Sequence, residues 1–118
     1  MDNSDGSAGS ERRVQKRVEV TMPFHVRGID AHGVEFEEST EAVQVSRRGL
    51  SFLTRRELKP LAVVTLLIPG RGPNRPGVGP TDFFTTAAVI NIFKEGELYH
   101  VGLRFIGATL TMYSSETV

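Results

Sequence analysis

Apolar and polar residues alternate with a period of two along several segments of this chain, and that pattern constrains its fold more than any other feature. Near the N-terminus, every second residue is apolar over Val18, Val20, Met22, Phe24 and Val26. Such alternation is typical of a β-strand with one buried face and one solvated face. Pro23 lacks a backbone N–H, which favours an edge position or a bulge midway along this strand.

Further strands follow, separated by residues that form turns. Asp30–Gly33 supplies turn chemistry before an extended run at Val34–Phe36, and an acid-rich piece at 37–41 leads into the next strand. The nearly continuous run Leu61–Ile68 is rich in β-branched residues. It predicts a central strand that is buried on both faces.

The second half of the chain predicts a long loop and a hairpin. Pro69–Asp82 contains four of the six prolines and four of the twelve glycines, so we expect a long mobile loop without a packed element. Pro80 stands where a phosphate-binding loop needs a lysine, which argues against such a loop. Phe83–Phe93 and Leu98–Ile106 predict two long strands joined by a hairpin turn.

Together these segments predict an all-β fold, a six-stranded antiparallel β-barrel, since no segment shows convincing helical periodicity. A length of 118 residues predicts one domain. We expect residues 1–11 to form a disordered tail because they are almost all polar. Residues 12–106 would form the barrel with a basic N-terminal arm, and 107–118 would be mostly unstructured.

Composition limits the classes of partner. The 14 basic and 14 acidic residues balance, so bulk attraction to a nucleic acid polymer is not expected. The charges are segregated along the chain, which suits a confined anionic ligand. There is no cysteine, the N-terminus lacks the apolar core of a signal peptide, and the longest apolar run is too short to span a bilayer. We expect a cytoplasmic protein with no membrane partner.

Two basic pairs precede the first strand. Arg13 and Arg17 are four residues apart, as are Arg12 and Lys16, so each pair can share one side of a helical turn or of a bent arm. A solvated basic linker is the alternative interpretation of this segment.

A second polar feature is the turn between the strands that contain Val45 and Leu50. In this turn Ser46 offers a hydroxyl group, and Gly49 offers a backbone position with no Cβ. Two adjacent arginines lie between them.

Catalytic and metal sites have little support. His25, His32 and His100 fall on outward strand faces or in a turn, without metal-ligand spacing. Ser46 lacks the Gly-x-Ser-x-Gly context of a nucleophile. We therefore expect neither an enzyme nor a metal site.

The order of these motifs resembles the PilZ domain family. Arg13-x-x-x-Arg17 lies ahead of a long first strand, Gln44-x-Ser46-x-x-Gly49 follows, and Val101-Gly102-Leu103-Arg104-Phe105 comes near the end. The similarity covers roughly residues 12–106. It implies a six-stranded barrel that binds cyclic di-GMP in bacterial signalling, using an Arg-x-x-x-Arg arm and an (Asp/Asn)-x-Ser-x-x-Gly turn.

The resemblance implies six ligand-binding residues: Arg12, Arg13, Arg17, Gln44, Ser46 and Gly49. The arginines would bind phosphates and one guanine edge, and the turn would meet the other guanine. Gln44 stands where the family pattern has Asp or Asn, so its amide lies one methylene further out. The segment after the last predicted strand is also too short to form the C-terminal helix that many such domains carry. An effector protein would recognise the ligand-bound form of the domain.

Two alternatives stay open. The first is a PilZ-like barrel that does not bind cyclic di-GMP and acts as a protein-protein interaction module. The second is a small barrel that binds RNA or single-stranded DNA. The second requires exposed aromatic residues, whereas four of the aromatics fall on predicted apolar faces: Phe24, Phe52, Tyr99 and Phe105.

Overall fold

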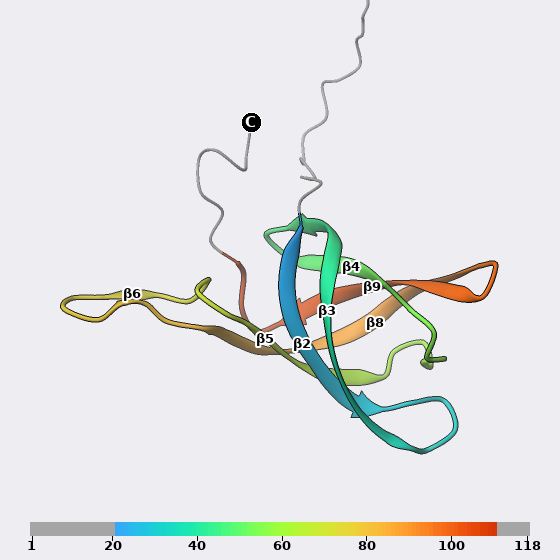
Figure 1. Ribbon diagram of the computed structural model, residues 1–118. Coiled ribbons are helices and arrows are strands. Elements are labelled where there is room, and N and C mark those ends of the chain that lie inside the picture. The colour runs from blue at the N-terminus through green and yellow to red at the C-terminus, as the bar shows by residue number, and fades with distance from the viewer. Residues whose placement is uncertain (1–20, 111–118) are drawn as a thin grey trace, which may run out of the picture.

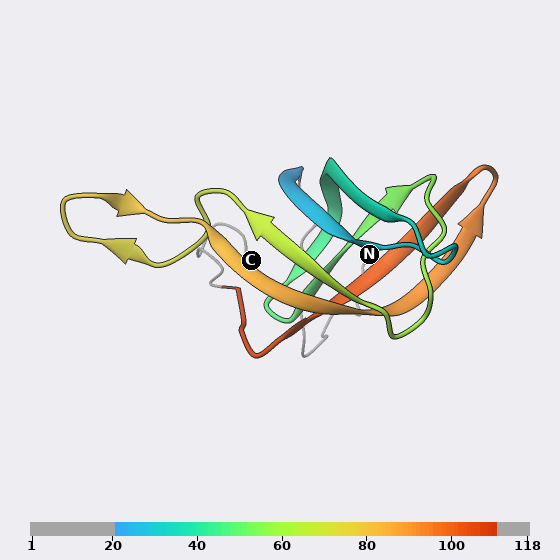
Figure 2. The ribbon, with the colours of Figure 1, turned by 90° about the horizontal axis from the view of Figure 1, so that it is seen from below.

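The structure, a computed structural model, describes residues 21–110. This range forms β2 (Met22–Ile29), β3 (Glu35–Ser46), β4 (Gly49–Thr54), β5 (Val63–Ile68), β6 (Asn74–Arg75), β7 (Gly79–Pro80), β8 (Phe83–Glu95) and β9 (Leu98–Ile106). Six of these strands close into a barrel in the order β2-β3-β4-β9-β8-β5 (Figures 1 and 2), and every neighbouring pair is antiparallel. The predicted six-stranded antiparallel barrel is confirmed. The described residues contain no helix, and therefore none able to cross a membrane.

The period-two pattern explains the core. In β2, Met22, Phe24 and Val26 are buried while the residues between them are exposed. Phe24 packs edge to face against Phe52 of β4, with ring centroids 5.2 Å apart. Pro23 lies in a regular pairing with Glu41 of β3, without a bulge. The missing N–H is tolerated because β2 pairs with β5 only from His25 to Arg27, so Pro23 lies in an edge-like portion of β2.

The prediction that Leu61–Ile68 is buried on both faces is wrong. β5 begins at Val63 and alternates, with Val64, Leu66 and Ile68 buried and Val63 57% exposed. The described residues contain no helix to cover the outside of the barrel, and their other sheet, β6-β7, extends beyond the barrel (Figure 1). A continuous apolar run therefore gives one buried face and one partly solvated face.

The prediction of an unstructured loop at Pro69–Asp82 is also wrong. This segment forms a two-stranded ribbon, β6 and β7, which continues the β5–β8 hairpin beyond the barrel (Figure 1). Thr81 N–H donates to the Pro73 carbonyl at 3.0 Å, and Gly72 N–H donates to the Thr81 carbonyl at 2.7 Å. Prolines and glycines permit the ribbon because its outer backbone groups face solvent rather than another strand.

The acid-rich piece at 37–41 is part of one long strand rather than a connection. β3 runs without interruption from Glu35 to Ser46, with Glu37 and Glu41 on its exposed side. Its register against β4 shifts between Ala42 and Gln44, which places a bulge at Val43. Bulges bend a strand and re-aim the side chains that follow it.

The chain ends bear on the domain boundaries. The expected tail 1–11 and the basic arm 12–17 lie outside the described residues, as do 111–118. Residues 107–110 form no strand. Leu110 is nevertheless fully buried in the core, and its N–H donates to the Arg47 carbonyl at 2.8 Å. The chain thus remains attached to the barrel to residue 110.

Candidate functional site

The turn between β3 and β4 is held by its own serine. The Ser46 hydroxyl accepts a hydrogen bond from the Arg48 N–H at 3.3 Å and donates to the Gly49 carbonyl at 3.4 Å. Serine commonly stabilises turns in this way. The Arg47 and Arg48 carbonyls accept from Leu110 and Phe105, so the turn is fixed from both sides while both arginine side chains are exposed.

Gly49 is required by packing rather than by an unusual backbone angle. A Cβ at this position would lie 2.0 Å from the Leu103 carbonyl oxygen of β9. Gly49 does not have a positive φ. The close approach that its missing side chain permits is therefore that of β4 to β9.

The predicted residues of the turn line one concave pocket. Its volume is about 380 Å³, and its walls include Gln44, Ser46 and Gly49. Arg48 and Arg104 contribute positive charge to the same pocket. The structure thus brings together the three predicted residues that it describes, and the bulge at Val43 directly precedes Gln44.

The sequence interpretation missed the part of the pocket formed by the last hairpin. Asn91 and Phe93 of β8, with His100 and Arg104 of β9, line it as well. Phe93 is 61% exposed, unlike the predicted apolar-face aromatics, of which Phe24 and Phe52 are fully buried. Extending the strand register from the hairpin turn across to β4 is the signal that could have located these side chains.

The remaining predicted residues, Arg12, Arg13 and Arg17, lie outside the described residues. The described chain begins at Thr21, and Met22 pairs with Ala42 of β3. Ala42 lies four positions before Ser46 on β3. The chain therefore enters the barrel at the end that carries the turn, as Figure 1 shows.

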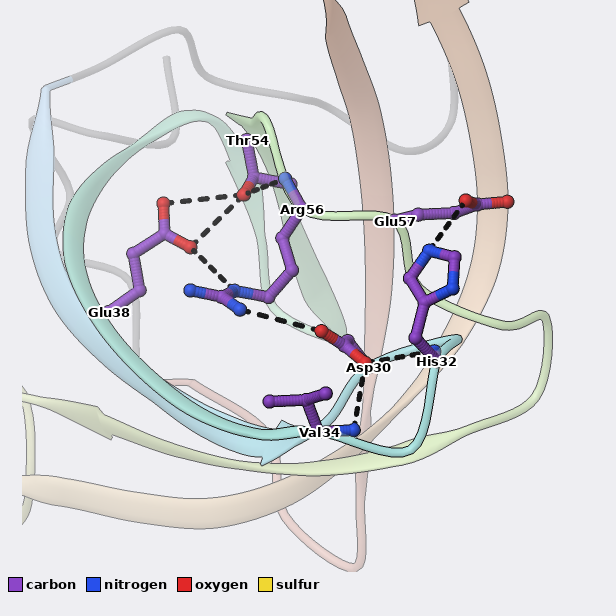
Figure 3. Close-up of polar contacts among 7 residues, drawn as sticks. All are labelled: Asp30, His32, Val34, Glu38, Thr54, Arg56 and Glu57. Carbon is purple, nitrogen blue, oxygen red and sulfur yellow. Dashed lines mark hydrogen bonds and ion pairs between the residues drawn. The ribbon is translucent and has the colours of Figure 1, made fainter.

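A second polar cluster lies at the other end of the barrel (Figure 3). The Asp30 carboxylate accepts the N–H groups of His32 and Val34 at 2.9 and 3.0 Å, and Arg56 lies 3.5 Å from it. The hydrogen bond from Val34 is the main cause that lowers the pKa of Asp30, while desolvation opposes it.

This cluster joins the β2–β3 connection to the segment after β4. Thr54 Oγ1 donates to Glu38 at 3.0 Å, and Arg56 stacks over the Phe36 ring at 4.6 Å. His32 Nε2 lies 3.2 Å from Glu57. The cluster therefore links the two segments through ion pairs of Arg56 with Asp30 and Glu38.

Within residues 21–110, no three or more histidine and carboxylate side chains gather in a way that could hold a metal ion. His25 bonds Ser39 at 2.6 Å, and His100 lies 3.6 Å from Glu95. Each of these two side chains thus has a polar neighbour on an adjacent strand or hairpin.

No protein-family model matches the sequence, and a search of curated proteins finds no significant match. The functional argument therefore rests on the residues and their geometry.

Proposed function

We propose that this chain is a PilZ-like receiver domain that binds cyclic di-GMP and changes the surface it shows to an effector protein. The observation that carries the proposal is the pocket that gathers Gln44, Ser46 and Gly49 beside Arg48 and Arg104. A dinucleotide with two phosphates and two guanines needs cations and hydrogen-bonding groups in one place, and this pocket supplies both.

Chain length allows the N-terminal arginines to reach the pocket. Arg17 precedes Thr21 by four residues and Arg13 precedes it by eight. An extended chain spans at most about 3.5 Å per residue, which gives reaches of roughly 14 and 28 Å. Ser46 lies four residues along β3 from the partner of Met22, a distance of about 13 Å.

Arginine suits both parts of the proposed ligand. Its planar guanidinium group pairs with phosphate oxygens through two parallel hydrogen bonds and matches O6 and N7 of guanine in the same way. Arg13 and Arg17, with Arg12 beside them, would bind phosphate and one guanine. Gln44 would meet the other guanine through its side-chain amide.

Ligand binding would hold residues 12–17 against the turn and alter the surface at that end of the barrel. The change would be local, because the Ser46–Gly49 turn is already fixed by hydrogen bonds to Phe105 and Leu110. The effector would recognise the closed arm rather than a rearranged barrel.

Calorimetric titration with cyclic di-GMP tests the proposal. We expect micromolar affinity that Arg13→Ala or Arg17→Ala abolishes. The matched control is Arg55→Ala, which removes an exposed arginine that pairs with Glu97 away from the turn. Gln44→Asn is expected to tighten binding, since the amide then stands where the family pattern places it. No heat at millimolar ligand would overturn the proposal.

The alternative function is an interaction module that does not bind cyclic di-GMP. It is favoured by one observation: Ser46 and Gly49 are both explained by the turn and by strand packing, without any ligand. Exposed Ile90 and Phe93 at the pocket would then contact a protein partner. Absence of binding heat in the titration, with the fold intact by circular dichroism, supports this alternative.

A further inference from the structure

The outer face of the barrel carries a row of residues that crosses four strands beneath the pocket. Gln44 of β3 pairs with Ser51 of β4, Ser51 pairs with Gly102 of β9, and Gly102 pairs with Asn91 of β8. All four line the pocket. We call this row the pocket floor.

The floor contains a buried hydroxyl group that the fold does not use. Ser51 is only 9% exposed, and its Oγ has no hydrogen-bond partner among residues 21–110. A buried polar group without a partner destabilises the folded state. Ser51 lies on the outer side of β4, because its neighbours Leu50 and Phe52 face the core.

Gly102 makes the floor concave. A Cβ at this position would contact Asn91 Cβ at 3.4 Å and Asn91 Nδ2 at 3.5 Å. A side chain there would fill the space between Ser51 and Asn91. The floor therefore combines a buried hydroxyl group with the side-chain amides of Gln44 and Asn91 around a shallow gap.

The neighbouring rows differ in chemistry. On one side, Gly49 pairs with Arg104, which places a guanidinium group next to the floor. On the other side, His100 pairs with Phe93, whose exposed ring can cover the face of a flat ligand. Cation, hydrogen-bonding floor and aromatic ring thus follow one another across the pocket, in the order that suits a phosphate, a base edge and a base face.

From this arrangement we propose that the pocket floor reads the edge of one guanine, with Ser51 and Asn91 as specificity-determining residues in addition to Gln44. The inference rests on the proposed function and deepens it. Hydroxyl and amide groups each donate and accept, so they match an edge that carries both kinds of group. Guanine presents O6 and N7 as acceptors and N2 as a donor, whereas adenine presents a donor where guanine has O6.

The test titrates the full chain with cyclic di-GMP and with cyclic di-AMP, by calorimetry and by NMR of side-chain amide signals. We expect Ser51→Ala and Asn91→Ala each to weaken cyclic di-GMP binding by about five-fold or more. Both substitutions should also reduce the preference of the protein for cyclic di-GMP over cyclic di-AMP. Gly102→Ala should weaken binding by filling the floor. Ser39→Ala and Asn74→Ala are matched controls outside the pocket, and they should leave the affinity unchanged.

The outcomes separate the inference from the proposed function. If Ser51→Ala and Asn91→Ala bind cyclic di-GMP as the wild type does, and the Asn91 amide signal does not move, the floor inference is wrong while the receiver stands. If the wild type does not bind cyclic di-GMP, the receiver fails and guanosine monophosphate becomes the probe. A shift of the Asn91 signal that Gly102→Ala removes then supports the floor, and no shift overturns it.

Discussion

The Ser51 hydroxyl group bears on the stability of the barrel as well as on the proposed recognition of guanine. Because its Oγ is buried without a partner among the described residues, removal relieves a cost to the folded state. We expect Ser51→Ala to unfold at the same urea concentration as the wild type or a higher one, with a gain of up to about 1 kcal/mol. Urea titration followed by circular dichroism measures this. A clear loss of stability would show that the hydroxyl has a structural partner.

At Gly49, in contrast to Ser51, we expect a substitution by alanine to lower the stability of the barrel. Its added Cβ would meet a backbone carbonyl at 2.0 Å, which no side-chain rotation can relieve. We expect Gly49→Ala to destabilise the barrel by about 3 kcal/mol or more, as overpacking against backbone does. Thermal unfolding measures it, with Gly102→Ala as the control because its contacts of 3.4 Å are tolerable. Equal melting of the two variants would contradict the packing argument.

It follows that loss of ligand binding in Gly49→Ala is weak evidence for a ligand contact. The variant separates β4 from β9, and Arg104 pairs with Gly49 in that ladder. The arginine and floor variants report on recognition more directly, because they leave the strand pairing in place.

The connection between β2 and β3 couples folding to pH. Asp30 has a lowered pKa, mainly because it accepts the Val34 N–H. A carboxyl group that ionises more readily in the folded state stabilises the fold above the ordinary Asp pKa of about 4. That contribution is lost as the pH falls through the lowered value.

We therefore expect Asp30→Asn to unfold at lower urea than the wild type at neutral pH. The difference should shrink as the pH falls below the Asp30 pKa, where the wild-type carboxyl is also neutral. Urea titrations across acidic and neutral pH measure this. Glu37→Gln, an exposed carboxylate of β3, is the control. A constant difference at all pH values would contradict the linkage.

The β6–β7 ribbon is expected to be dispensable for the barrel. The backbone N–H groups of Gly72, Val78 and Thr81 bond within the ribbon, that of Arg71 bonds the Ile68 carbonyl, and the barrel pairing of β5 with β8 ends at Ile68 and Phe83. Replacing residues 71–81 by a short turn should change the free energy of unfolding by less than about 1 kcal/mol, since loop length affects closure entropy only slowly. Thermal unfolding measures this, and collapse of the barrel would contradict it.

At the level of elements, the sequence predicted the barrel strands but not the exposed outer face of β5 or the β6–β7 ribbon. Alternation at Met22–Val26 located a buried face, because side chains of a strand alternate regardless of the sheet around it. The run at 61–68 could not reveal its exposed outer face, which depends on the absence of a covering layer in the described fold. Prolines at 69–82 suggested a loop, yet an isolated ribbon tolerates them.

At the level of the molecule, the two halves of the proposed site come from distant parts of the chain. The motif at 44–49 could be found by spacing, since one turn holds it. Ser51, Asn91 and Gly102 have no motif of their own, and the register from the hairpin turn locates them only once the order of the barrel strands places β8 and β9 beside β4. Ser51 also looks ordinary until its burial without a partner is known.

Terminal deletions test the assembly of the whole site. We expect removal of residues 1–11 to leave cyclic di-GMP affinity unchanged, because no proposed ligand residue lies there. Removal of residues 1–17 should abolish binding while the barrel still folds. Calorimetry with circular dichroism measures both properties. Full binding by the shorter chain would show that the pocket acts without the arginines.

The described chain begins and ends beside one short stretch of β3 and its turn: Met22 pairs with Ala42, and Leu110 bonds Arg47. A domain whose ends lie close together can be inserted into a surface loop of another protein without pulling that host apart. Both junctions would lie near the pocket, so a ligand bound in the pocket would strain the connections to the host protein. Such a fusion would make the host protein a sensor of the proposed ligand.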